Sequence, residues 1–192
     1  MITKTDAAER QLNTAIRLFF ENRDHLSSYA LAVASREVTD GVIKSLRSEL
    51  YQRELARVGD PLKVLLSYGE ELEILIKPEF YKSVIKLYNK WQNFLKHADE
   101  DPDAEIEPFT TKLLALVILT AMKNYFLLTQ HWTTEMVTFL SWIAVAEPQL
   151  VKLAPGDVIT EAIAEMRSGI SGDPYDRDTL KNIYTAMTTF LA

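Results

Sequence analysis

Cysteine is absent from the 192 residues, which excludes disulfide bonds, zinc sites built on thiolates and thiol catalysis. Positive net charge is also lacking, because 21 Lys and Arg face 27 Asp and Glu, for a net charge of −6. A protein that coats nucleic acid by bulk charge is therefore not expected, although a local basic face stays open.

Long hydrophobic runs are missing as well. The longest unbroken apolar stretch is 113–119, much shorter than the ~20 residues that a membrane-spanning helix needs. The N-terminus turns polar at once and has no apolar stretch of signal-peptide length behind it. We therefore expect segment 113–122 to be a buried helix, and the protein to be cytoplasmic with no membrane partner.

Glycine and proline are scarce, at 6 and 7 residues, and they fall between long stretches with apolar residues three and four apart. This periodicity is typical of amphipathic helices, and no run alternates as a strand would. The predicted helices cover about 6–21, 28–57, 78–98, 110–130, 136–146, 157–169 and 178–191, with short helical turns in 61–76. The predicted fold class is all-α: one domain over 1–192, an antiparallel helical bundle over about 6–130 with additional helices in 131–192.

Local patterns refine this prediction. Asp6 and Glu9 have the spacing of a helix cap and its partner, and Ser27 or Ser28 can cap the second helix. Aromatic residues stand at helical spacing, which favours core packing over a platform for stacked bases. They include Phe19, Phe20, Trp91 and Phe94.

No pattern indicates a metal or cofactor. The three histidines are far apart, and the chain has neither a Gly-rich phosphate loop nor a G-x-S-x-G motif. Asp99, Asp101 and Asp103 match the first, third and fifth positions of a calcium loop. Ala104 and Thr110, however, stand where that loop needs Gly and a bidentate Glu, so a solvated acidic connector is the better interpretation.

The third predicted helix differs from the rest of the chain in charge. Between residues 77 and 97 there are five lysines against one glutamate. Lys82, Lys86 and Lys90 follow one another at four-residue steps, which places them along one edge of a helix. A basic stripe on an acidic protein is typical of a site for a phosphate-bearing partner, but it equally suits a solvated edge that faces an acidic neighbour. With Lys96, these lysines are the candidate phosphate-binding residues.

The stripe leads into Gln92, Asn93 and His97, the candidate catalytic residues. Asn93 and His97 are four apart and share a helix face. His97 lies near the predicted C-terminal end of its helix, where the helix dipole favours a protonated imidazole. An imidazole with a pKa near 6.5 can act as a general acid or base at cellular pH.

On these residues the sequence resembles the HEPN (higher eukaryotes and prokaryotes nucleotide-binding) superfamily. The family motif is an Arg, a polar residue that is often Asn, three variable residues and a His, and this chain matches it at Asn93 and His97. The Ala-rich stretch 29–34 on the second helix is also similar. The resemblance covers about 6–130. It implies a helical bundle, commonly dimeric, that binds RNA or a nucleotide and in many members cleaves RNA without a metal.

The chain departs from the motif at Gln92, which occupies the place of the Arg. The resemblance implies that the His handles the proton of a ribose 2′-hydroxyl and that the Arg stabilises phosphate charge. Gln brings neither the positive charge nor the five donors of Arg. Losing a group aimed at the transition state typically costs ~10²–10³ in rate. We therefore predict weak or absent ribonuclease activity, with RNA or nucleotide binding retained.

Two alternatives stay open. The first is a non-catalytic helical module that binds a protein partner, with an incidental basic stripe. The second, a helical transcription regulator, is weaker because neither end of the chain carries a basic helix-turn-helix. The predicted partners are thus RNA or a nucleotide, a second copy of the chain and, in the first alternative, another protein.

Overall fold

The structure is a computed structural model. The residues that it describes are 1–21, 23–58, 75–76, 86, 89–95, 103, 105–107, 110–148, 151–152, 157–170 and 172–191. Within these ranges the protein is a bundle of helices, which confirms the predicted all-α class. The named helices are α1 (Lys4–Glu21), α2 (His25–Val58), α5 (Thr111–Thr129), α6 (Thr134–Ala146), α7 (Asp157–Gly169) and α8 (Arg177–Phe190). Residues 89–95 are helical too.

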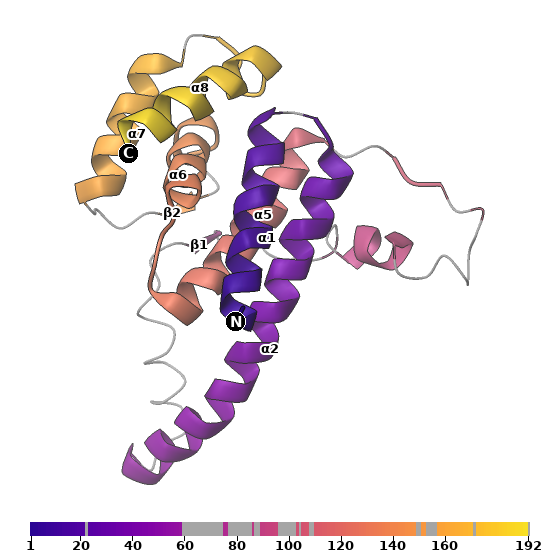
Figure 1. The fold of residues 1–192 in the computed structure, drawn as a ribbon, viewed down its shortest axis with the longest axis vertical. Coiled ribbons are helices and arrows are strands. Elements are labelled where there is room, and N and C mark those ends of the chain that lie inside the picture. The colour runs from indigo at the N-terminus through magenta and orange to yellow at the C-terminus, as the bar shows by residue number, and fades with distance from the viewer. Residues whose placement is uncertain are drawn as a thin grey trace.

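The bundle is built on α1 and α2, which run antiparallel and pack against each other (Figure 1). Helix α5 lies against both of them, and α6, α7 and α8 gather at one end of this three-helix unit. The C-terminal half of α2 extends well beyond the N-terminal end of α1. The additional C-terminal helices predicted from the sequence therefore pack on the bundle mainly through α1, which contacts both α6 and α8, while α7 packs on α6 and α8.

Within the described residues, a small strand pair is the one element that the sequence did not predict. Strand β1 (Leu75–Ile76) pairs antiparallel with β2 (Val151–Lys152), with Leu75 opposite Lys152. The prediction of helical turns over 61–76 is wrong for Leu75 and Ile76, and the rest of that range lies outside the described residues. Pairing across some 75 positions in sequence leaves no local periodicity to detect.

The core is rich in aromatic rings. Phe19 and Phe20 of α1 are fully buried and meet Phe139 and Trp142 of α6. The ring centroid of Phe19 lies 5.2 Å from that of Phe139 and 4.9 Å from that of Trp142. Both pairs are edge-to-face, an arrangement that aromatic rings prefer. Tyr184 of α8 stacks on Phe20 at 5.3 Å. The predicted core role of Phe19 and Phe20 is thus confirmed.

A buried carboxylate fixes the C-terminal helices to α5. Glu147, at the end of α6, is 5% exposed, and its Oε1 accepts from the Tyr175 hydroxyl at 2.6 Å and from Lys112 Nζ at 2.7 Å. Burial and the adjacent Glu147 raise the pKa of the Tyr175 hydroxyl above its usual range, so that Tyr175 stays a donor. The Trp142 indole also donates to the carbonyl of Pro174 at 3.0 Å. The loop before α8 is therefore held by two aromatic residues.

The helix caps correct two predictions. Helix α1 is capped by Thr3, whose hydroxyl accepts from the Asp6 N–H at 3.0 Å while the Asp6 carboxylate accepts from the Thr3 N–H. Asp6 is therefore the partner of the cap and not the cap itself. At α2 the capping group is the Asp24 carboxylate, bonded by Ser27 N–H and Oγ. Ser28, an alternative cap in the prediction, is instead buried and donates to the carbonyl of Ala15.

Helix α5 is apolar and largely buried over 114–122, as predicted for segment 113–122. It begins after its N-cap Thr110 and ends at Gln130, which adopts a left-handed conformation with φ of 54°. By length and composition α5 is apolar enough to cross a bilayer, although half of its most apolar stretch is buried among the other helices. Since the core helix of a bundle meets the same criterion, this composition is weak grounds for a membrane span.

Candidate nucleic-acid interface

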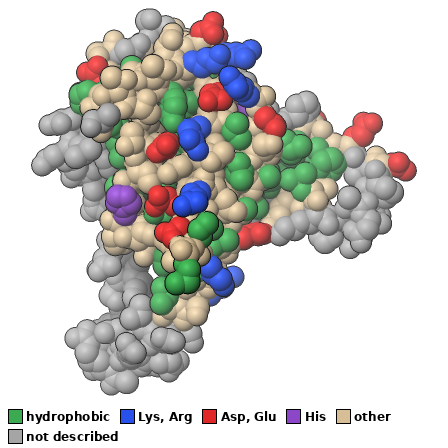
Figure 2. Space-filling view, in the orientation of Figure 1, with side chains coloured by type: hydrophobic (Ala, Val, Ile, Leu, Met, Phe, Trp, Pro, Cys, Tyr) green, Lys and Arg blue, Asp and Glu red, His purple; other side chains and the backbone are tan. Residues whose placement is uncertain are grey.

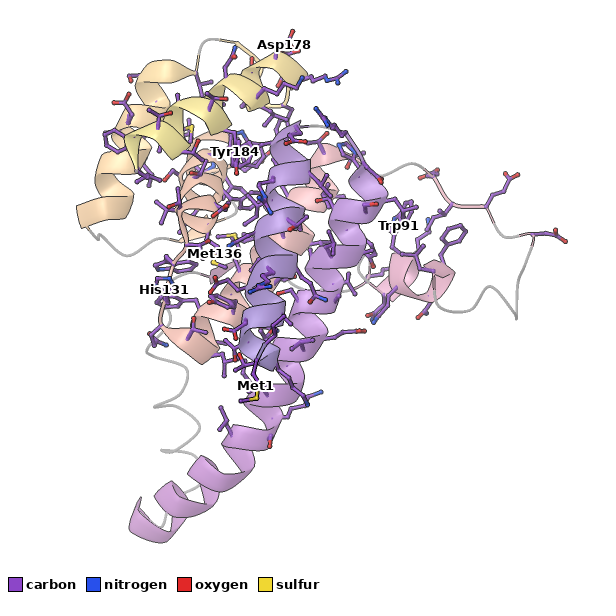
Figure 3. All side chains as sticks on the ribbon, viewed as in Figure 1. Met1, Trp91, His131, Met136, Asp178 and Tyr184 are labelled. Carbon is purple, nitrogen blue, oxygen red and sulfur yellow. The ribbon has the colours of Figure 1, made fainter. Side chains whose placement is uncertain are left out.

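The helical segment 89–95 packs on α2 through aromatic side chains. Trp91 is 7% exposed and points toward α2, with its ring centroid 6.2 Å from that of Tyr29 (Figure 3). Phe94 is half-buried and meets Trp91 edge-to-face at 6.0 Å. The apolar face of this segment is thus turned inward, which confirms the predicted packing role of Trp91 and Phe94.

Lys86, Lys90 and Asn93 lie along one flank of this helical stretch, next to the face that packs on α2. The steps of four and three residues between them place all three on one helix face, and all three side chains are exposed. Neither lysine forms an ion pair with any residue that the structure describes. We call these three residues the basic face. Of the remaining candidate residues, Lys82, Lys96 and His97 lie outside the described residues.

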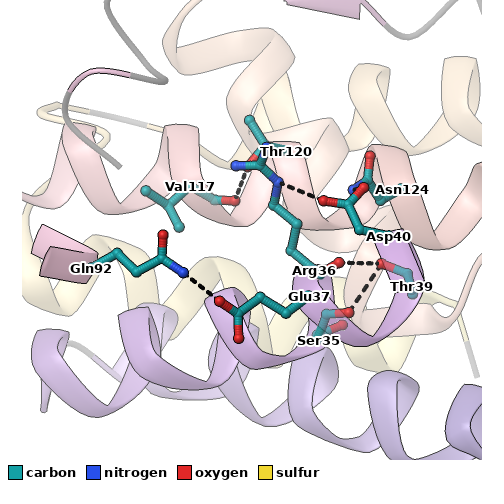
Figure 4. A network of polar contacts seen from close by, with 9 residues as sticks. All are labelled: Ser35, Arg36, Glu37, Thr39, Asp40, Gln92, Val117, Thr120 and Asn124. Atoms are coloured by element: carbon teal, nitrogen blue, oxygen red, sulfur yellow. Dashed lines mark hydrogen bonds and ion pairs between the residues drawn. The ribbon is translucent and has the colours of Figure 1, made fainter. Parts of the chain in front are cut away.

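Gln92 is separated from the basic face. Adjacent positions on a helix are about 100° apart, and the half-buried Gln92 is turned toward α2, where its amide Nε2 donates to the Glu37 carboxylate (Figure 4). Of the predicted trio of Gln92, Asn93 and His97, Gln92 thus points in a different direction from Asn93. A phosphate beside Gln92 would meet the negative charge of Glu37, which disfavours an anion site at this position.

Glu37 belongs to a polar network between α2 and α5 (Figure 4). Asp40, one turn further along α2, accepts from Asn124 Nδ2 of α5 at 2.7 Å and lies 3.8 Å from Arg36 Nε. Only 15% of the Arg36 side chain is exposed. Asp40 therefore faces the one guanidinium in this network, and that guanidinium is too buried to replace the missing Arg of the motif.

The sequence contains a signal for part of this network. Arg36 and Asp40 are four residues apart on one helix, a spacing that predicts an ion pair. Glu37 and Gln92 are 55 positions apart, and no local pattern connects them. The contact that most changes the interpretation of the candidate site is therefore one that sequence spacing could not reveal.

In the view of Figure 2 the face that carries α1 mixes Lys and Arg with Asp and Glu along the same surface. Among the described residues, no three His, Asp or Glu side chains come together as metal ligands do. The chemistry that the basic face supplies is positive charge from two ammonium groups and hydrogen bonding from one amide.

Taken together, fold and site define an all-α helical bundle with an exposed basic face. No protein-family model, curated protein or solved structure matches the chain. The resemblance to HEPN proteins rests on Asn93, His97 and the order of the helices, and it stays a prediction.

Proposed function

We propose that this protein is a HEPN-like helical module that binds RNA through the basic face and has weak or absent ribonuclease activity. The observation that carries the proposal is the joint exposure of Lys86, Lys90 and Asn93 on one helix face. A lysine that balances an acidic neighbour would be drawn to a carboxylate, but neither Lys86 nor Lys90 pairs with one in the described part of the chain. Their charge is available to a partner.

The three side chains suit a single nucleic-acid strand. Two ammonium groups one helical turn apart can each contact a phosphate, a contact that brings affinity without sequence preference. The Asn93 amide both donates and accepts, so it can bond a base edge or a ribose 2′-hydroxyl. An accessible 2′-hydroxyl is what distinguishes RNA from DNA at such a site, and RNA is therefore the expected ligand.

Binding without efficient cleavage follows from the position of Gln92. The Gln92 amide is neutral and is also turned to the Glu37 carboxylate, so this position neither supplies positive charge nor points a donor at a phosphate in the transition state. Cleavage, if it occurs, would use His97 as acid or base and Asn93 to orient the substrate, with Lys90 or Lys96 as the source of charge. Dimerisation through the bundle belongs to the same proposal, and sedimentation velocity of the full chain tests it.

The binding test uses a fluorescein-labelled single-stranded RNA, anisotropy and a buffer that contains EDTA. The double variant Lys86→Glu and Lys90→Glu should bind about tenfold more weakly or worse, because two phosphate contacts become repulsions. The matched control is Arg167→Glu with Arg177→Glu, two exposed cations on α7 and α8 with the same total charge change. Equal affinity of the two double variants would contradict the proposal, and no retention of RNA at low salt would favour the protein-binding alternative.

The cleavage test uses the same RNA on a denaturing gel. We expect little or no cleavage in EDTA, and any that occurs should disappear in His97→Ala while RNA affinity stays within about twofold of the wild type. Efficient metal-independent cleavage by the wild type would overturn the view that Gln92 disables the site.

A further inference from the structure

A pocket opens between α7 and α8, at the end of the molecule formed by the C-terminal helices. Its volume is about 200 Å³, below the ~300–1,000 Å³ of sites that hold drug-sized ligands, so it suits a small molecule. Helix α7 contributes two residues and α8 contributes a stripe at helical spacing. The described lining residues are Glu165, Met166, Thr179, Asn182, Ile183, Ala186 and Met187.

The floor of the pocket is apolar and adaptable. Met166, Ile183 and Met187 are all buried, at 5% exposure or less. Thioether side chains are flexible and polarizable, which lets them adjust around an aromatic or aliphatic group. An apolar group placed on this floor leaves water, and this transfer is the main favourable contribution to binding.

The rim carries hydrogen-bond acceptors and a negative charge. Glu165 and Asn182 are exposed, and within the described residues neither side chain has a hydrogen-bond or ion-pair partner. The Thr179 hydroxyl donates to the Asp176 carboxylate at 3.2 Å, so its oxygen can act only as an acceptor toward a ligand. Glu165 is the only charged group among the described lining residues. A bound anion would be repelled here, whereas a cation would be attracted.

We propose that this pocket binds a small organic cation: a primary ammonium group on a short linker to an apolar ring or chain. The ammonium donates to the Glu165 carboxylate and to the Asn182 side-chain oxygen, and the apolar body lies on Met166 and Met187. The proposal is independent of RNA binding, because the pocket residues belong to α7 and α8 and the basic face belongs to the segment 86–93.

The probe is phenethylammonium, compared with phenethyl alcohol, which has nearly the same shape and no charge. The protein is labelled with ¹³C at the methionine methyls, and the chain has five methionines. Met166 and Met187 report on the pocket, while the core residues Met122 and Met136 serve as internal controls. We expect saturable shifts of Met166 and Met187 alone, with the alcohol binding more weakly than the ammonium by about two- to fivefold, as for an exposed ion pair.

Two variants make the result specific. Glu165→Gln should bring the ammonium down to the affinity of the alcohol, whereas Glu105→Gln, an exposed acid in a loop, should not. Ala186→Phe should fill the pocket from its exposed rim and remove the shifts for both probes. Equal affinity for ammonium and alcohol in the wild type, wild-type affinity in Glu165→Gln, or no saturable shift would each overturn the proposal.

Discussion

The aromatic core and the segment 89–95 use aromatic residues in different ways. In the core, Phe19 contacts three other rings and no part of it reaches solvent. In the segment, Trp91 and Phe94 anchor the helix to the bundle, while the adjacent Lys90 and Asn93 are exposed. The aromatic core holds the fold together, whereas the segment 89–95 is anchored to the bundle and exposes polar side chains to solvent. Stability and binding should therefore respond to different substitutions.

The core should give the largest effect on stability. Phe19→Ala removes a fully buried ring and leaves a cavity between α1 and α6, which should lower the free energy of unfolding by about 3–5 kcal/mol. Urea denaturation followed by circular dichroism measures it. Phe190→Ala is the matched control, because Phe190 is 48% exposed and its loss should change stability by less than about 0.5 kcal/mol. Similar losses for both variants would disprove the assigned core.

The buried carboxylate that ties α6 to α5 comes next. Glu147→Gln keeps the shape but weakens the bonds from Tyr175 and Lys112, and hydrogen bonds to a charged group contribute about 1.5–3 kcal/mol. We expect a loss of about 2 kcal/mol by the same denaturation assay, and none in the exposed Glu105→Gln. A cycle with Tyr175→Phe should show coupling, and additive losses would mean that the two residues act separately.

The substitution Gln92→Arg tests whether position 92 serves packing against α2 or the binding of substrate. In a HEPN-like site with all other parts in place, this change would restore the motif and produce cleavage. The structure predicts another outcome: the new guanidinium pairs with Glu37, stability changes by less than about 1 kcal/mol, and RNA cleavage in EDTA does not rise. A gain of cleavage that also needs His97 would show that the contact with Glu37 yields to substrate.

The smallest effect concerns the cap of α2. Bonds from the Ser27 hydroxyl and N–H lower the pKa of Asp24 in the folded protein. Its stabilisation is therefore complete above the unfolded pKa of about 3.9 and is lost as the pH falls through the folded value. Asp24→Asn keeps a capping oxygen without titrating, so the urea midpoint should fall less between pH 6 and pH 3 than in the wild type. An equal fall in both proteins would show that titration of Asp24 does not contribute to the loss of stability at low pH.

The helices themselves could be predicted because their signals are local. Thr110, the apolar run that follows it and Gln130 placed α5 within one residue of its ends. The caps were harder, because Asp24, Ser27 and Ser28 all have capping side chains and only tertiary packing removes Ser28 from the choice. The contact of Gln92 with Glu37 depends on how distant segments meet. The exposure of Lys86 and Lys90 follows from helical periodicity, but the partner of Gln92 does not.

The salt dependence of RNA binding tests the central claim most directly, since it counts the phosphates that the protein neutralises. The slope of log K against log salt is negative, and each lost contact to a single strand lowers its magnitude by about 0.7. Lys86→Glu with Lys90→Glu should therefore reduce the magnitude of the slope by about 1.4 or more, while Arg167→Glu with Arg177→Glu leaves it unchanged. If both double variants keep the slope of the wild type, the basic face does not contact RNA.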